Sequence, residues 1–167
     1  MRVEAEQRLG QPIGKSERIA NHQTAKQIFG QMARAEKNSR GHSIALAPQF
    51  KQRSQRQTAQ AVYHFLRDGM VYRKEPNSKQ TAKEIRRYIS DGYGDCKHYA
   101  TFAVGILNAC RIPAWFVLVS QRQGSKTPNH AYAACMIGTD IVVIDPCRPT
   151  FNDECKHFHK YNLSPRN

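Results

Sequence analysis

The chain has 167 residues, 40% of them hydrophobic, and a formal net charge of +13. This length suits one domain with a substantial core, and no apolar run approaches the length of a transmembrane helix. The positive charge favours contact with something acidic, such as nucleic acid, although a solvated basic surface accounts for it equally well.

The five cysteines are an odd number and lack the spacing of a disulfide framework, so we interpret them as free thiols. Residues 1–17 contain no apolar stretch of the kind found in secretory signals. Together these features predict a protein that stays in a reducing compartment, the cytoplasm, and does not contact a membrane.

Residues 1–54 predict a basic N-terminal arm with a helical extension. Within this part, residues 1–22 show no periodic pattern and are expected to form a poorly ordered arm. Residues 23–37 predict a helix, and the polar segment 38–43 is expected to end it. If the protein contacts a polyanion, this basic region is the expected point of contact.

The middle of the chain predicts two more helices. Residues 57–72 carry apolar side chains at helical spacing, with Thr58 as the expected N-cap and Gly69 as the expected stop. Residues 81–89 predict a short helix that opens on a capping box starting at Thr81.

The pattern becomes stronger from Asp95, which can cap a helix over 96–110 with one continuous apolar stripe. Residues 114–120 then predict a buried strand, and residues 130–137 and 141–145 predict the two strands of a hairpin. Helices followed by strands close in sequence indicate an antiparallel sheet packed on the long helix, which is an α+β architecture.

Three side chains in this second half could carry chemistry. Cys96 falls in the first turn of the long helix, where unpaired backbone N–H groups and the helix dipole favour a thiolate. His98 points to the other side of the helix, but His130 begins a strand that would face the helix and could exchange a proton with the thiol. Asp145, at the end of the next strand, could orient the imidazole.

The hairpin geometry supports the pairing of His130 with Asp145. If Gly138 and Thr139 form a two-residue turn, Asp145 lies opposite Tyr132. Side chains alternate along a strand, so Tyr132 and His130 share a face, and Asp145 becomes a diagonal neighbour of His130. A three-residue loop would place Asp145 on the opposite face.

The segments "GYGDCKHYATFAVGILNACRIPAWFVLV", "NHAYAACMI" and "VVIDP" together resemble the transglutaminase-like superfamily of papain-fold proteins. That family has a Gly-rich turn, a Cys at a helix start, Ile-Pro-Ala after the helix, a His-x-aromatic strand and an Asp-Pro strand end. The resemblance covers roughly residues 57–150 and implies a transglutaminase-like domain over 55–167. It implies Cys96 as the nucleophile, His130 as the general acid/base and Asp145 as the orienting carboxylate. We expect no cofactor.

Two residues depart from the family pattern. Arg111 stands where a glycine usually precedes Ile-Pro-Ala, so the usual glycine cap of the helix is not expected, and Tyr132 stands where Trp is common. The backbone N–H of Cys96 is the expected first donor to an oxyanion. The second donor is left open among Tyr93, Asn77 and Gln80.

A second group of potential metal ligands lies near the C-terminus. Its members are Cys147, Cys155, His157 and His159. Their spacing matches no standard zinc finger, so we assign no metal site and expect no stoichiometric zinc in protein purified without added metal.

The resemblance implies an enzyme that forms a thioester acyl-enzyme from the amide bond of a protein or peptide. Hydrolysis needs only water, so a cysteine peptidase or amidase ranks above a crosslinking transglutaminase. Two alternatives from other classes remain: a catalytically silent structural or assembly protein of the same fold, and a basic module that binds nucleic acid.

Overall fold

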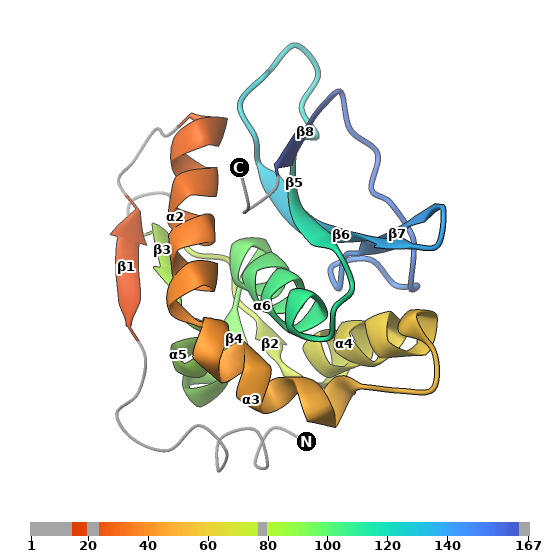
Figure 1. Cartoon of the computed structure of the whole chain (residues 1–167). Helices are drawn as coiled ribbons and strands as arrows, with labels where there is room; N and C mark the ends of the chain where they lie inside the picture. Colours follow the sequence, from red (N-terminus) through yellow and green to blue (C-terminus); the bar gives the residue numbers. More distant parts are fainter. Residues whose placement is uncertain (1–14, 20–23, 77–79, 164–167) are drawn as a thin grey trace.

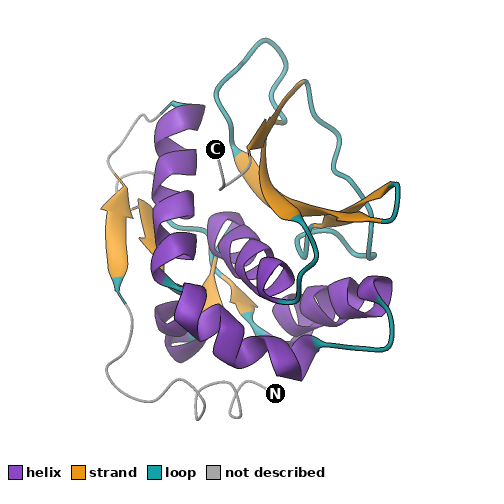
Figure 2. Ribbon diagram, viewed as in Figure 1, coloured by secondary structure: helices purple, strands orange, loops and turns teal. Residues whose placement is uncertain are grey.

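A computed structural model describes residues 15–19, 24–76 and 80–163. Its central element is helix α6 (Cys96–Ala109), which lies between an antiparallel sheet on one side and the remaining helices on the other (Figures 1 and 2). This arrangement is the α+β architecture that the sequence predicts. No helix within the described residues is long and apolar enough to cross a membrane.

The main sheet has four antiparallel strands in the order β7-β6-β5-β8. Their bounds are β5 (Ala114–Ser120), β6 (His130–Ile137), β7 (Asp140–Ile144) and β8 (His159–Leu163). The first three match the predicted strands closely, whereas β8 was not predicted. Both faces of β5 are buried, since Phe116 faces the helices and Val117 belongs to a second apolar cluster on the other face.

The N-terminal helices pack into the same core as the rest of the chain. Their bounds are α2 (Ala25–Asn38), α3 (Arg40–Phe50) and α4 (Gln55–Gly69). The expected end of the first helix in segment 38–43 is confirmed, since α2 ends at Asn38, but the chain breaks only at Ser39 and then continues as α3, which was not predicted. Ser39 is buried, and its hydroxyl donates to the Ala35 carbonyl while it accepts from the backbone N–H of Ile85.

Two predicted helix starts are displaced in the structure. Ser54, not Thr58, caps α4, because its hydroxyl accepts from the backbone N–H of Gln57 at 3.2 Å. The predicted stop at Gly69 is confirmed. The predicted helix over 81–89 is wrong in its first half, which forms a strand.

That strand, β3 (Gln80–Lys83), pairs antiparallel with β1 (Ser16–Ile19). Helix α5 (Ile85–Asp91) begins only after it, with Glu84 at the N-cap position. Residues 16–19 therefore form a strand where an unordered arm was expected, because their backbone finds a partner far away in the sequence. Residues 1–14 and 20–22 of the predicted arm lie outside the described residues. A further short pair joins β2 (Val71–Tyr72) and β4 (Tyr93–Gly94) in parallel.

Helix α6 is buried on every side, and not only along the predicted stripe. All its residues from Lys97 to Leu107 are buried, as expected for a helix enclosed by other elements. Gly105 allows the closest approach, since a Cβ there would come within 2.7 Å of Ile85 and 2.8 Å of Ser43. The helix can therefore be covered by α3 and α5 as well as by the sheet.

Helix α6 ends in a Schellman motif despite the absence of a glycine. The backbone N–H of Ile112 donates to the Leu107 carbonyl (2.9 Å), and that of Arg111 donates to the Asn108 carbonyl (3.0 Å). Arg111 occupies the left-handed position, with φ of 63°. The expectation that this helix lacks its usual cap is therefore wrong. The cap has its usual backbone geometry, and the strained residue in the left-handed position is Arg111 instead of a glycine.

We expect Arg111→Gly to stabilise the protein by about 0.5–1 kcal/mol. Relief of left-handed strain is worth about 1–2 kcal/mol, and the greater freedom of glycine in the unfolded chain removes part of it. Urea denaturation followed by circular dichroism measures the change. Arg111→Ala is the matched control and should give no gain, because alanine keeps the strain; equal stabilisation by both variants would contradict this explanation.

Candidate active site

Cys96 is the first residue of α6, and the capping box around it fixes the start of the helix. The Asp95 carboxylate accepts from the backbone N–H of Lys97 (3.2 Å), and His98 Nδ1 accepts from the backbone N–H of Asp95 (3.0 Å). The predicted cap and helix start are both confirmed. His98 is buried and held by this box, so it is not the partner of the thiol.

The glycines before Cys96 have distinct structural roles. Gly92 ends α5 in the left-handed conformation, with φ of 72°. Gly94 packs so tightly that a Cβ would come within 2.8 Å of both His98 and Tyr88. The "GYGDC" segment therefore lets the chain turn from α5 into α6 in very little space.

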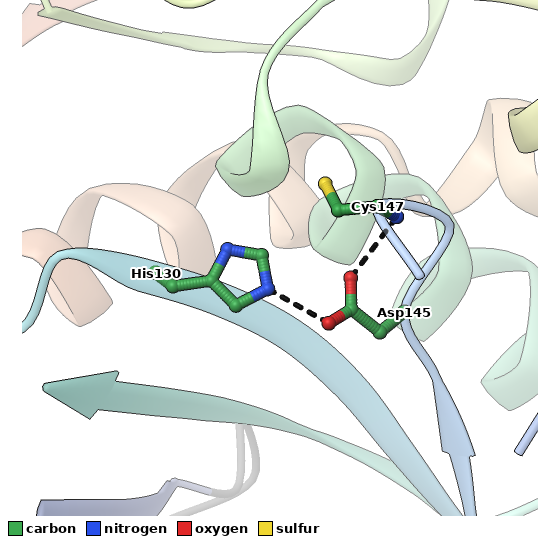
Figure 3. Close-up of side chains that lie close together, drawn as sticks. All are labelled: His130, Asp145 and Cys147. Carbon is green, nitrogen blue, oxygen red and sulfur yellow. Dashed lines mark hydrogen bonds and ion pairs between the residues drawn. The ribbon is translucent and has the colours of Figure 1, made fainter. Parts of the chain in front are cut away.

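His130 and Asp145 lie together at the end of the hairpin formed by β6 and β7. The register pairs Ile137 with Asp140, which leaves a two-residue turn. The alternation of side chains along the two strands predicts that these residues share a face, and His130 Nε2 donates to Asp145 Oδ2 at 2.8 Å (Figure 3). Asp145 is buried, and its other oxygen accepts from the backbone N–H of Cys147 at 3.1 Å.

The electrostatics of this pair favour a protonated imidazole. Burial lowers the pKa of His130, but hydrogen bonds to Asp145 and Cys96, with their negative charges, raise it to about 10. Because Asp145 already occupies Nε2, the other ring nitrogen, Nδ1, is the one left for Cys96. The structure therefore brings the three predicted site residues together from α6, β6 and the end of β7.

Sequence reasoning missed Tyr72, a tyrosine that interacts electrostatically with Cys96. Its position in β2 is opposite Gly94, and its ring packs edge-on against Tyr99 with 5.9 Å between ring centroids. Burial raises the pKa of Tyr72, and the negative charge of Cys96 raises it further, so its hydroxyl stays a donor. A two-residue strand leaves no readable pattern in the sequence.

The three residues considered as second oxyanion donors are placed differently. The Gln80 side-chain amide donates to the Glu75 carbonyl at 2.9 Å, and its oxygen accepts from Lys97. The Tyr93 ring lies under the cationic ends of Arg73 and Lys83, 4.1 and 4.0 Å from its centroid. Asn77 lies outside the described residues.

A buried charge network holds the start of α6 in place. The Lys97 ammonium forms a short ion pair with Asp95, lies 3.5 Å from Glu75 and donates to the Gln80 side chain at 2.7 Å. Burial alone would raise the pKa of Asp95, but its interactions with His98 and the Lys97 charge hold it well below its usual range. Oxygen and nitrogen atoms of Glu75, Asp95 and His98 would suit a metal ion, but Lys97 already supplies positive charge there.

The C-terminal cysteines and histidines do not form a cluster of their own. Cys155 is buried on the outer face of the sheet, and His157 Nδ1 bonds to the Cys155 carbonyl at 2.9 Å. His159 belongs to β8, opposite Ser120. Cys147 instead lies beside His130 and Asp145. All five cysteines are free thiols.

We expect Lys97→Met to destabilise the fold by about 3–5 kcal/mol, because it leaves the carboxylates of Asp95 and Glu75 buried without a counter-charge. The free energy of unfolding in urea measures the effect. Lys126→Met, at an exposed loop position, is the control and should change stability little. Equal stability of the two variants would show that Lys97 does not hold the network together.

Comparison with solved structures shows a similar fold in another protein. A candidate protease from Parabacteroides distasonis has a TM-score of 0.58 at 13% identity, covering 72% of this chain and 26% of its own. A candidate cysteine protease from Cytophaga hutchinsonii (TM-score 0.43, 14% identity, 72% and 38% covered) and a TGase (0.48, 17%, 82% and 36%) are also similar. The chain thus spans about a quarter to two fifths of these proteins.

The chain matches no curated protein at a significant level. A family profile, in contrast, matches residues 44–146, which is more than half of the chain. The matched segment contains the start of α6, both strands of the hairpin and the carboxylate at its end. On this match, together with the α+β fold, the chain belongs to the transglutaminase-like superfamily.

Proposed function

We propose that the protein is a cysteine-dependent enzyme that cleaves amide bonds in proteins or peptides through a thioester intermediate. The observation that carries this proposal is the position of His130, which is hydrogen-bonded to Asp145 and close enough to Cys96 for the thiol to raise the pKa of the imidazole. A thiol at a helix start, a base and an orienting carboxylate are the elements of an activated nucleophile.

In the proposed reaction the Cys96 thiolate attacks the carbonyl carbon of the substrate, and a C–S bond forms as the carbonyl electrons move to oxygen. The backbone N–H of Cys96 is available to the resulting oxyanion, and we propose the Tyr72 hydroxyl as a second donor. When the oxyanion collapses, the C–N bond breaks and the leaving amine takes a proton from His130.

The thioester is then opened by a second nucleophile. Water, losing a proton to His130, adds to the thioester carbonyl, and the C–S bond breaks to release a carboxylic acid and free Cys96. An amine in place of water would give transamidation. We propose hydrolysis, because it needs no second substrate beyond water.

Asp145 has an electrostatic part in this cycle. Its carboxylate holds the Nε2–H of His130, which fixes the orientation of the ring and presents Nδ1 to Cys96. Because the pKa of His130 is raised to about 10, the imidazolium persists through the neutral range and is lost only as the pH rises toward that value. The protonated ring is therefore available as the acid for the leaving amine at neutral pH.

We expect the wild-type protein to hydrolyse members of a mixed peptide library and Cys96→Ser to lose at least about 10³-fold of that rate. Mass spectrometry of the library identifies the products, since hydrolysis adds water whereas transamidation joins two peptides. Cys110→Ser, which removes a thiol from the other end of α6, is the matched control and should remain active. Equal product formation by wild type and Cys96→Ser would rule out a thioester route.

We also expect Cys96 to be the most reactive of the five thiols toward iodoacetamide at pH 6. A protonated His130 and the start of α6 both stabilise its thiolate, whereas burial raises the pKa of Cys110 and raises that of Cys135 to about 12. Peptide mapping after brief labelling measures the five rates.

His130→Ala should slow the labelling of Cys96 and leave that of Cys110, at the other end of α6, unchanged. If Cys96 reacts no faster than Cys147 or Cys155, and His130→Ala changes nothing, the protein is a catalytically silent member of its family.

A further inference from the structure

One thiol beside the His130–Asp145 pair has no part in the proposed reaction. Cys147 follows Asp145 by two residues, and its backbone N–H donates to Asp145 Oδ1, which turns the chain back toward the pair. Figure 3 shows the Cys147 thiol and the His130 ring around the Asp145 carboxylate. Cys147 is an exposed residue, so solvent reaches this side of the group.

These three residues offer the atoms that a zinc ion uses. A ring nitrogen of His130, a carboxylate oxygen of Asp145 and Sγ of Cys147 all lie within 4.8 Å of one another. In a tetrahedral zinc site the ligands lie about 2.0–2.3 Å from the metal, and hence about 3.3–3.8 Å from each other. Small side-chain adjustments can therefore close the group around an ion.

From this arrangement we propose that His130, Asp145 and Cys147 form a reversible, inhibitory site for Zn²⁺. The binding part of the proposal is independent of the proposed function, and only the inhibition rests on it. The thiol and imidazole ligands favour zinc over Mg²⁺ and Ca²⁺, which prefer oxygen. Three protein ligands leave the fourth tetrahedral position to water.

Zinc on His130 would stop the ring from acting as a base. If the metal takes Nε2, the neutral ring carries its one proton on Nδ1 and cannot accept another from the thiol of Cys96. If the metal takes Nδ1, the nitrogen that serves Cys96 is itself occupied. Asp145 is also drawn from the imidazole to the metal, so both partners of the nucleophile are lost together.

Binding has to displace protons, which limits its strength. Partial burial of the thiol and the negative charges of Asp145 and Cys96 raise the pKa of Cys147, and His130 is protonated as described above. Metal binding releases both protons, so the site is weaker than a permanent structural zinc site. The proposal therefore agrees with the expectation that protein purified without added metal holds no stoichiometric zinc.

The binding test uses the full chain, freed of metal with a chelator and titrated with Zn²⁺ in competition with a metal-sensitive dye. We expect one Zn²⁺ per chain, and at least a 10-fold weaker affinity in Cys147→Ser. Two controls locate the site: Cys155→Ser and Cys96→Ser should bind as the wild type does. No binding by the wild type, unchanged binding by Cys147→Ser, or loss of binding in Cys96→Ser would overturn the site.

Two measurements on the wild type remain decisive if a variant fails to fold. Co²⁺ in place of Zn²⁺ should give the charge-transfer absorption of a metal thiolate, and Zn²⁺ should protect Cys147 from iodoacetamide in peptide mapping. Absence of both signals would overturn the proposal even without a variant.

Inhibition is tested separately, by measuring peptide hydrolysis. Zn²⁺ should abolish the hydrolysis, and EDTA should restore it. If the protein binds Zn²⁺ at Cys147 but hydrolyses no peptide under any condition, the proposed function fails while the metal site stands. If it hydrolyses peptides at the same rate with the site filled, the inhibition is overturned.

Discussion

Burial of helix α6 from Lys97 to Leu107 is the constraint on which the rest of the structure depends. Because the body of the helix is enclosed on every side, partners from the protein itself satisfy the polar groups at its two ends. At the C-terminal end these partners are the backbone groups of the Schellman motif. At the N-terminal end they are the Asp95 carboxylate and the His98 imidazole.

The same constraint explains why charged groups gather around a structural helix end. The Asp95 carboxylate is needed as a cap and is buried, so it requires a cation, which Lys97 provides. Lys97 in turn contacts Glu75 and Gln80, which ties the segment before β3 to α6. The thiol of Cys96 lies at this same helix end and interacts with His130.

Much of the second half of the chain was readable in the sequence because its elements follow from local rules. A capping residue, a long apolar stripe and a two-residue hairpin each need only neighbouring residues, and they correctly placed Cys96, His130 and Asp145. The two-residue turn and the alternation of side chains along the strands were enough to predict that His130 and Asp145 lie on one face of the hairpin.

The features that sequence reasoning missed depend on distant or weak partners. Helix α3 contains Gly41 and Pro48 and shows little periodicity, so only its packing against α6 makes it helical. Strand β3 exists because residues 16–19 pair with it. Tyr72 reaches the site from a two-residue strand, which leaves no recognisable pattern. Cys147 was considered only as one of the C-terminal potential metal ligands, and its position in a turn gave no sign that it lies beside His130 and Asp145.

The loop over 121–129, between β5 and β6, is closed at its base. The backbone N–H of Asn129 donates to the Val119 carbonyl (2.9 Å), and the Asn129 side chain accepts from the backbone N–H of Gln121 (2.7 Å). The pairing of His130 with Val119 is thus fixed before the chain leaves the sheet. Changes in the length or composition of this exposed loop leave the imidazole where it is. Substitutions, insertions and deletions in this loop can therefore accumulate without moving His130 from its place in the sheet.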